Sequence, residues 1–274
     1  MKIINFTTPS KFAGILRRGL LAFTLIELLL VITIIGLLAA VGLPHLKGWG
    51  EANAMTAATR QLVDDLSYAR QKAISSRSTV YVVFISSNIV DSAYYNILLP
   101  ADKVAHSNLL SGQYTSYALY APGSVGDQPG RPNHKYLTPW KSLPEKIFIA
   151  PVKFKGATEA VRMAENDLAL RSMTTIYPVP FPRVNDAGKT RNLPCIVFDS
   201  QGRLVSEKNG STYENAVIPL TRGSIFYARD ANGNLLFQPA DVLETPPGNS
   251  ISNKNHIVID WLTGRAHVER EEFK

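Results

Sequence analysis

The run of 21 residues from Phe23 to Leu43 constrains the fold of this chain more than any other feature, because Glu27 is its only charged residue. At about 1.5 Å per residue, a helix of this length is roughly 31 Å long, close to the thickness of a membrane's hydrocarbon core. The run therefore predicts a transmembrane helix over residues 23–43. Basic residues precede it and no acidic residue does, which places the amino terminus in the cytoplasm and the following chain across the membrane. These basic residues are Lys2, Lys11, Arg17 and Arg18.

The position of Glu27 needs an explanation, because a carboxylate at membrane depth costs roughly 2.5 to 3.5 kcal/mol and is normally kept only where it has a partner. One explanation is that Glu27 lies near the membrane surface and has no specific role. The other is that cleavage between Ala22 and Phe23 creates a new α-amine, on this or a neighbouring chain, which pairs with Glu27. A secretory signal has a shorter apolar core than this run, and the surroundings of the Arg17 and Arg18 pair fit a twin-arginine signal poorly.

The segment "AFTLIELLLVITIIGLLAAVGLP" resembles the amino terminus of type IV pilins and type II secretion pseudopilins. The resemblance implies that a prepilin peptidase cuts between Ala22 and Phe23 and methylates the new amine of Phe23. It also implies that Glu27 is the assembly carboxylate, and Pro44 matches the proline that commonly ends the spanning section. The family usually has glycine before the cut, and here that residue is Ala22. We therefore expect cleavage to occur, but more slowly.

The residues after the apolar run predict a second, amphipathic helical section over residues 44–76. Pro44 cannot donate a backbone hydrogen bond, so a kink is expected there. Small and apolar residues then recur at steps of three and four, which indicates one helix face that packs against a sheet. They are Ala52, Met55, Ala58, Leu62, Leu66, Ala69 and Ala73.

From residue 77 to residue 274 the pattern predicts a β-rich head. Thr79–Ile85 and Tyr94–Leu99 are rich in β-branched and aromatic residues and indicate strands. The range of about 100–194 is rich in proline and glycine and reads as an irregular insertion between core strands. Three later segments each show a strand, a glycine turn and a returning strand, with Gly202, Gly233 and Gly264 in the turns.

These elements together predict an α+β fold, with a long amino-terminal helix packed on an antiparallel β-sheet head, as in pilins. Within that family, "LVDDLSYARQKAISSRSTVYVVF", "IVFDSQGRL" and "IVIDWLTGRAHV" are similar to minor pseudopilins of the GspH/FimT type. The expected domains are a cytoplasmic leader (1–22), a transmembrane helix (23–43), an amphipathic helix (44–76) and the head (77–274).

The sequence contains no arrangement of residues that indicates catalysis, a metal or a cofactor. The five histidines are far apart and outside any metal-binding spacing, and there is no phosphate loop, dinucleotide fingerprint or nucleophile elbow. Asp230, Asn232 and Asn234 have the alternating oxygens of a calcium loop, but a hairpin turn explains them as well. The single cysteine, Cys195, excludes an intrachain disulfide and is expected in a buried strand.

Nucleic acid is not an expected partner, because the net charge of +7 includes the basic residues before the apolar run, which we assign to topology. A possible exception is a set of aromatic residues near Arg131, His134 and Lys135, although packing beneath a long loop explains these rings as well. They are Tyr114, Tyr117, Tyr120, Tyr136 and Trp140.

The expected function is that of a structural subunit, of minor type, in a type II secretion pseudopilus or a type IV pilus, and not that of an enzyme. The expected location is the bacterial inner membrane, with a single pass and the head outside the cytoplasm. The expected partners are the prepilin peptidase, other pilin or pseudopilin subunits, and the assembly platform with its ATPase. The alternative is a minor pilin whose head binds DNA, a surface or a secreted substrate.

Overall fold

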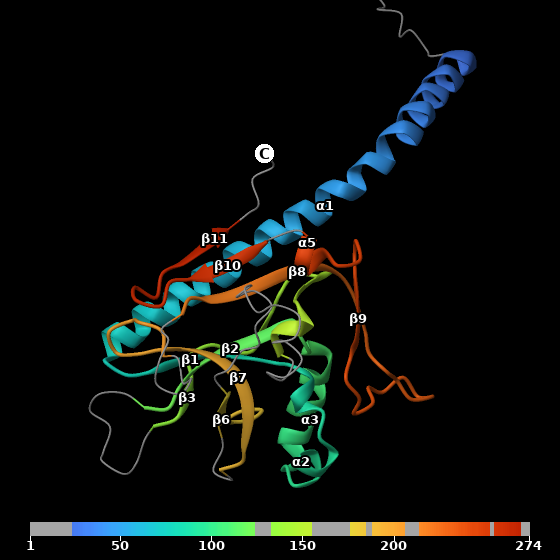
Figure 1. Cartoon of the computed structure of the whole chain (residues 1–274). Coiled ribbons are helices and arrows are strands. Elements are labelled where there is room, and N and C mark those ends of the chain that lie inside the picture. Colours follow the sequence, from blue (N-terminus) through green and yellow to red (C-terminus); the bar gives the residue numbers. More distant parts are fainter. Residues whose placement is uncertain are drawn as a thin grey trace, which may run out of the picture. The chain divides into compact units, whose positions relative to one another are not determined.

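The structure is a computed structural model, and it describes residues 24–123, 133–154, 176–184, 188–205, 214–252 and 255–269. The chain divides into two compact units, Met1–Trp49 and Gly50–Lys274, and each is described by itself. The first helix, α1 (Leu25–Ser76), contributes residues to both units (Figure 1).

In the first unit, the part of α1 from residue 25 to residue 40 exposes all of its side chains. Among the residues that the structure describes, no helix is both long enough and apolar enough to cross a membrane. The predicted fold, with a transmembrane first half of the long helix, and the predicted single-pass location in the inner membrane are therefore wrong.

In the second unit, α1 buries one face of its remaining turns. The predicted stripe is confirmed wherever its side chains are described, because these residues are at most 9% exposed: Met55, Ala58, Leu62, Leu66, Ala69 and Ala73. Asp65, a charged residue, is also buried. Two residues from the head hold its carboxylate: the Tyr117 hydroxyl donates to Oδ2 at 2.6 Å, and Lys141 Nζ contacts Oδ1 at 2.7 Å.

The first sheet of the head has six antiparallel strands. The order is β3-β2-β1-β7-β6, and β4 also pairs with β2. Its register follows the alternation of side chains between two faces, with Val82 opposite Leu119 on β2 and Ile196 on β7. Its strands are β1 (Val80–Phe84), β2 (Ser116–Ala121), β3 (Lys135–Tyr136), β4 (Lys141–Ser142), β6 (Ile176–Pro180) and β7 (Thr190–Phe198).

The second sheet has five antiparallel strands in the order β11-β10-β8-β5, and β9 also pairs with β8. Figure 1 shows β8, β10 and β11 running beside α1. The range expected to be an insertion, about 100–194, supplies strands to both sheets, including β2 and β5. The strands of this sheet are β5 (Ile147–Ile149), β8 (Ala216–Phe226), β9 (Asp241–Glu244), β10 (His256–Ile259) and β11 (Ala266–Glu269).

Short helices cover the face of the first sheet that is turned away from α1. The strand predicted over Tyr94–Leu99 is wrong, because this segment belongs to helix α2 and the turn after it. Asp91 caps that helix, accepting bonds from the backbone N–H groups of Ala93 and Tyr94 at 2.9 and 3.1 Å. The remaining helical segments include short 3₁₀ turns at 87–89, 110–112 and 151–154. The α-helices after α1 are α2 (Ser92–Asn96), α3 (Pro100–Leu109) and α5 (Asn249–Ser252).

The core has two main layers because β1 alternates its side chains. Val80, Val82 and Phe84 join α1 and strands of both sheets in one cluster, whereas Val83 belongs to a second cluster with α2 and α3. Cys195 on β7 is buried in the second cluster, which confirms the prediction that the cysteine lies in a buried strand. The helix and the two sheets therefore share one continuous core.

The glycine turns that follow β7 and β10 meet beside α1. Gly202 and Gly264 have φ angles of +78° and +63°, which confirms their predicted turn role. A Cβ on Gly264 would lie 1.9 Å from the carbonyl oxygen of Gly202, so only hydrogen fits there. Arg70 on α1 donates from Nε to the carbonyl oxygen of Thr263 at 2.6 Å and thereby ties the helix to this junction.

Candidate functional site

The predicted assembly residue, Glu27, lies in the first turn of α1 and forms a reciprocal cap with Thr24. The backbone N–H and the hydroxyl of Thr24 each donate to Oε2 of Glu27 at 2.9 Å. In return, the backbone N–H of Glu27 donates to the Thr24 hydroxyl oxygen at 3.3 Å. The backbone N–H of Leu28 donates to the Thr24 carbonyl oxygen at 3.1 Å, so Thr24 is the residue at which the helix begins. The sequence T-x-x-E therefore forms a capping box.

This geometry favours the ionised form of Glu27. The backbone and side-chain hydrogen bonds from Thr24 lower the pKa of the Glu27 carboxyl below its ordinary value. Both side chains are exposed, and the bonds described above occupy only Oε2. The result is a carboxylate at the positive end of a helix, and among the described residues no hydrogen bond to its Oε1 is formed.

The other predicted site residues are placed only in part. Ala22 and Phe23, the expected cleavage and methylation residues, lie outside the described residues, directly before Thr24. Pro44 lies within the bounds of α1, so the helix does not end there, and the kink stays a prediction. The structure therefore places Glu27 at the start of the helix, and it is the fifth residue after the expected cut.

The aromatic residues considered for nucleic acid are packed within the head. Tyr117 and Tyr120 are fully buried, and Tyr120 donates to or accepts from His134 Nδ1 at 2.6 Å. The hydroxyl of Tyr136 and the indole N–H of Trp140 donate hydrogen bonds to backbone carbonyl oxygens at 2.7 and 2.8 Å. Because these rings pack on one another, they do not form a platform on which bases can stack. Arg131, the basic residue proposed beside them, lies outside the described residues.

In the turn considered for calcium, the carboxylate of Asp230 accepts hydrogen bonds from residues of the same turn. Asp230 Oδ1 accepts the backbone N–H groups of Asn232 and Asn234 at 2.9 and 2.8 Å. The hydrogen bond from the Asn234 side chain, followed by these backbone bonds, lowers the pKa of Asp230. Across the described ranges, no group of three His, Cys, Asp or Glu side chains is arranged to hold a metal ion. The turn is therefore a hairpin turn stabilised by its own aspartate.

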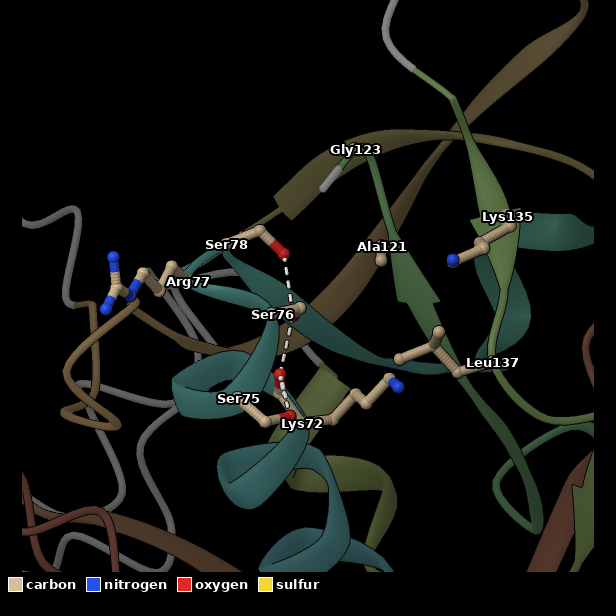
Figure 2. A pocket seen from close by; sticks show the side chains of 9 residues that line it. All are labelled: Lys72, Ser75, Ser76, Arg77, Ser78, Ala121, Gly123, Lys135 and Leu137. Atoms are coloured by element: carbon tan, nitrogen blue, oxygen red, sulfur yellow. Dashed lines mark hydrogen bonds between the residues drawn. The ribbon is translucent and has the colours of Figure 1, made fainter. Parts of the chain in front are cut away.

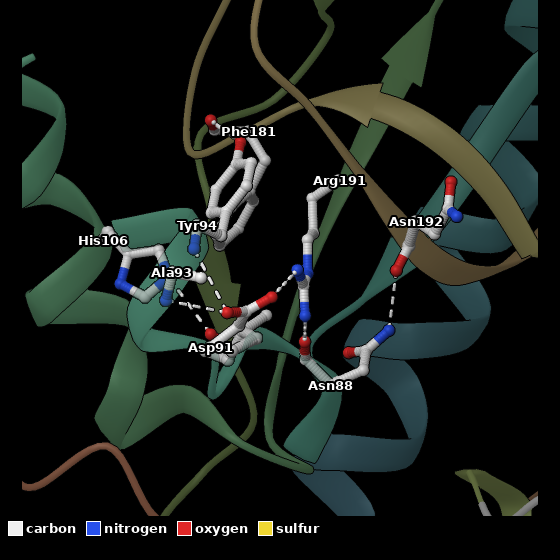
Figure 3. A network of polar contacts seen from close by, with 9 residues as sticks. Asn88, Asp91, Ala93, Tyr94, His106, Phe181, Arg191 and Asn192 are labelled. Carbon is white, nitrogen blue, oxygen red and sulfur yellow. Dashed lines mark hydrogen bonds and ion pairs between the residues drawn. The ribbon is translucent and has the colours of Figure 1, made fainter. Parts of the chain in front are cut away.

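A polar network joins α2 to β7 on the side of the head away from α1 (Figure 3). Arg191 donates to Asp91 Oδ2 at 2.5 Å and to the carbonyl oxygen of Asn88, and its guanidinium lies 5.3 Å from the centre of the Tyr94 ring. The ion pair with Arg191, with help from the α2 backbone, lowers the pKa of Asp91. The network fixes the loop before α2, and its ionic groups are satisfied by one another.

Beside this network, His106 of α3 is fully buried among aromatic rings. Its Nε2 lies 3.2 Å from the carbonyl oxygen of Ile89. In the described part of the chain, its Nδ1 has no hydrogen-bond partner. Burial lowers the pKa of His106 to about 4, so the ring is neutral at physiological pH.

Sequence reasoning missed two features of these sites. The capping role of Thr24 had a local signal, the T-x-x-E spacing before an apolar run. The pairing of Asp91 with Arg191 had none, because the two residues are 100 positions apart.

Comparisons with protein-family models, with characterised proteins and with solved structures give no match to this chain.

Proposed function

We propose that this chain is a structural subunit, of minor type, of a type II secretion pseudopilus or a type IV pilus. The observation that carries the proposal is the position of Glu27, an ionised and exposed carboxylate in the first turn of a helix and the fifth residue after the expected cut. The resemblance of the surrounding sequence to prepilin-type amino termini supports the same function.

The exposed apolar side chains of residues 25–40 provide the contact surface that assembly needs. Soluble monomers rarely expose a continuous apolar surface of this extent, and such surfaces usually mark interaction sites. In a filament, the helices of neighbouring subunits cover one another along this surface. The exposed residues are Leu25, Ile26, Leu28, Leu29, Leu30, Val31, Ile32, Ile34, Ile35, Leu37 and Leu38.

Cleavage before Phe23 gives Glu27 its electrostatic partner. The new ammonium group lies one residue before the helix cap, where the helix dipole is positive and repels it. Glu27 offsets this repulsion within its own chain or pairs with the amine of an adjacent subunit through Oε1. The prepilin peptidase, the other subunits, and the assembly platform with its ATPase are the partners in this process.

The processing step is tested by co-expressing the full chain with a prepilin peptidase and measuring its intact mass and amino-terminal sequence. The expected product begins at Phe23 and carries one added methyl group. An Ala22→Glu variant is expected to stay uncleaved, since the peptidase needs a small residue before the cut. A wild-type chain that stays uncut beside a prepilin that the same cells process contradicts the proposal.

The assembly step is tested with Glu27→Gln, which keeps the size of the side chain and removes its charge. We expect this variant to be processed but absent from the filament fraction that is sheared from cells. The matched control is Asp64→Asn, which removes an exposed charge from the same helix and should leave assembly unchanged. Normal incorporation of the Glu27 variant would show that the carboxylate has no role in assembly.

A further inference from the structure

A pocket of about 570 Å³ lies where α1 ends, beside β2 and β3 (Figure 2). This volume is within the usual range of small-molecule sites. All residues that line the pocket belong to the second unit, Gly50–Lys274, so an inference about it does not depend on the proposed filament function. Its lining residues are Lys72, Ser75, Ser76, Arg77, Ser78, Ala121, Gly123, Lys135 and Leu137.

The lining of the pocket is cationic and contains no acidic residue. In Figure 2 the side chains of Lys72 and Lys135 extend toward the same part of the pocket, on the side of Leu137, whereas Arg77 extends away from it. Within the described ranges, neither lysine forms an ion pair. Two converging ammonium groups without a counter-charge repel each other, so an anion between them is stabilised.

The end of α1 would ordinarily disfavour an anion, because the last carbonyl groups of a helix carry partial negative charge. Here several of these carbonyls are already bonded. The Ser75 and Ser76 hydroxyls donate to the carbonyl oxygen of Lys72 at 3.2 and 2.6 Å. The backbone N–H groups of Arg77 and Ser78 donate to the carbonyls of Ile74 and Ala73, which is the pattern of a Schellman cap.

The hydroxyl groups also limit what the pocket can bind. Since Ser76 donates to a backbone carbonyl, its contact of 3.0 Å with Ser78 uses the Ser78 proton. The serine protons are therefore engaged, and the serine oxygens are left as acceptors. Negative charge on a ligand is then recognised by the lysines, and an apolar surface from Ala121 and Leu137 remains for the rest of the molecule.

We infer that this pocket binds a small phosphate monoester, with its phosphoryl group between Lys72 and Lys135 and its organic part against Leu137. A phosphate monoester carries close to two negative charges at neutral pH, which matches two ammonium groups. The pocket is larger than a phosphate group alone, so the organic part is retained inside it.

The test is binding of phenyl phosphate and of inorganic phosphate to the full chain, measured by titration calorimetry and by chemical shifts of the lysine side chains. We expect phenyl phosphate to bind at least five times more tightly than inorganic phosphate. Lys72→Gln and Lys135→Gln should each weaken phenyl phosphate at least fivefold, and the double variant should abolish measurable binding. The control is Lys103→Gln, which removes a charge on α3 that lies over the ring of Tyr95. This variant should leave the affinity for phenyl phosphate unchanged.

Three results would overturn the inference. The first is the absence of phenyl phosphate binding at millimolar concentration in a wild-type chain whose circular dichroism is that of a folded protein. The second is an equal loss of affinity in Lys103→Gln, which would mean that only net charge matters. The third is that phenyl phosphate does not bind while a single-stranded oligonucleotide binds and depends on Lys72 and Lys135, which would make the pocket part of a nucleic-acid surface.

Discussion

The buried imidazole of His106 makes the stability of the head depend on pH in a way that can be calculated. Its pKa is about 4 in the folded chain and 6.5 in the ordinary, solvated state. Because the folded pKa is the lower one, the unfolded chain binds the proton more readily. Stability is therefore full above pH 6.5 and is lost as the pH falls from 6.5 to 4.

The size of the effect follows from the difference between the two pKa values. Each pKa unit corresponds to about 1.4 kcal/mol, so the complete loss is roughly 3 kcal/mol. Between pH 7 and pH 4.5 the expected loss from this one residue is about 2 kcal/mol. The physical cause is that protonation places a charge and a second N–H group, at Nδ1, among aromatic rings.

The assay is urea unfolding of the full chain at pH 7 and pH 4.5, followed by near-ultraviolet circular dichroism. His106→Gln keeps a donor for the Ile89 carbonyl and removes the titrating ring, so any loss that is independent of pH cancels in the comparison. Between pH 7 and pH 4.5, the free energy of unfolding of wild type should fall by about 2 kcal/mol more than that of this variant. His267→Gln, at an exposed histidine of β11, serves as the control and should behave as wild type. Parallel pH profiles for wild type and His106→Gln would refute the reasoning.

Three further predictions concern stability and are checked by urea or thermal unfolding. Gly264→Ala should lower the free energy of unfolding by about 3 kcal/mol, because its Cβ meets a backbone oxygen. Gly233→Ala has open space around the new Cβ and should lower it by only about 1 kcal/mol, because of the positive φ. Equal losses in the two variants would contradict this reasoning. Arg77→Gly should stabilise by about 0.5 kcal/mol, because arginine adopts a φ of 45° at the end of α1; a lower melting temperature would contradict it. Asp65→Ala should lower the free energy of unfolding by about 3 kcal/mol, because Lys141 loses its ion pair and the proton of the buried Tyr117 hydroxyl loses its acceptor; the exposed Asp64→Ala should lower it by less than 0.5 kcal/mol.

The sequence predicted what depends on local spacing. The buried face of α1 followed from the steps of three and four between Met55 and Ala73, and the turns followed from Gly202 and Gly264. Both are local signals, because one side chain every helical turn or one glycine between two strands is sufficient to produce them.

The sequence did not predict features that depend on partners far away along the chain. It also did not predict a segment whose capping residue and packing override the strand propensity of its own residues. Asp65 is buried because Tyr117 and Lys141, 52 and 76 positions away, neutralise and bond it. The segment from Tyr94 has the aromatic content of a strand, but the Asp91 cap and the packing of α2 select a helix. The transmembrane prediction relied on the apolar length of the sequence alone, and the described helix does not meet it.

The contact between the turns at Gly202 and Gly264 has a consequence for how the head unfolds. The first turn follows a strand of the six-stranded sheet, and the second joins two strands of the five-stranded sheet. Near the same place, the backbone N–H of Leu204 donates to the carbonyl oxygen of Trp261 at 3.0 Å. Opening either sheet therefore breaks backbone contacts of the other and exposes their shared core. The two sheets should lose structure in a single cooperative transition, with coincident midpoints for probes placed in each.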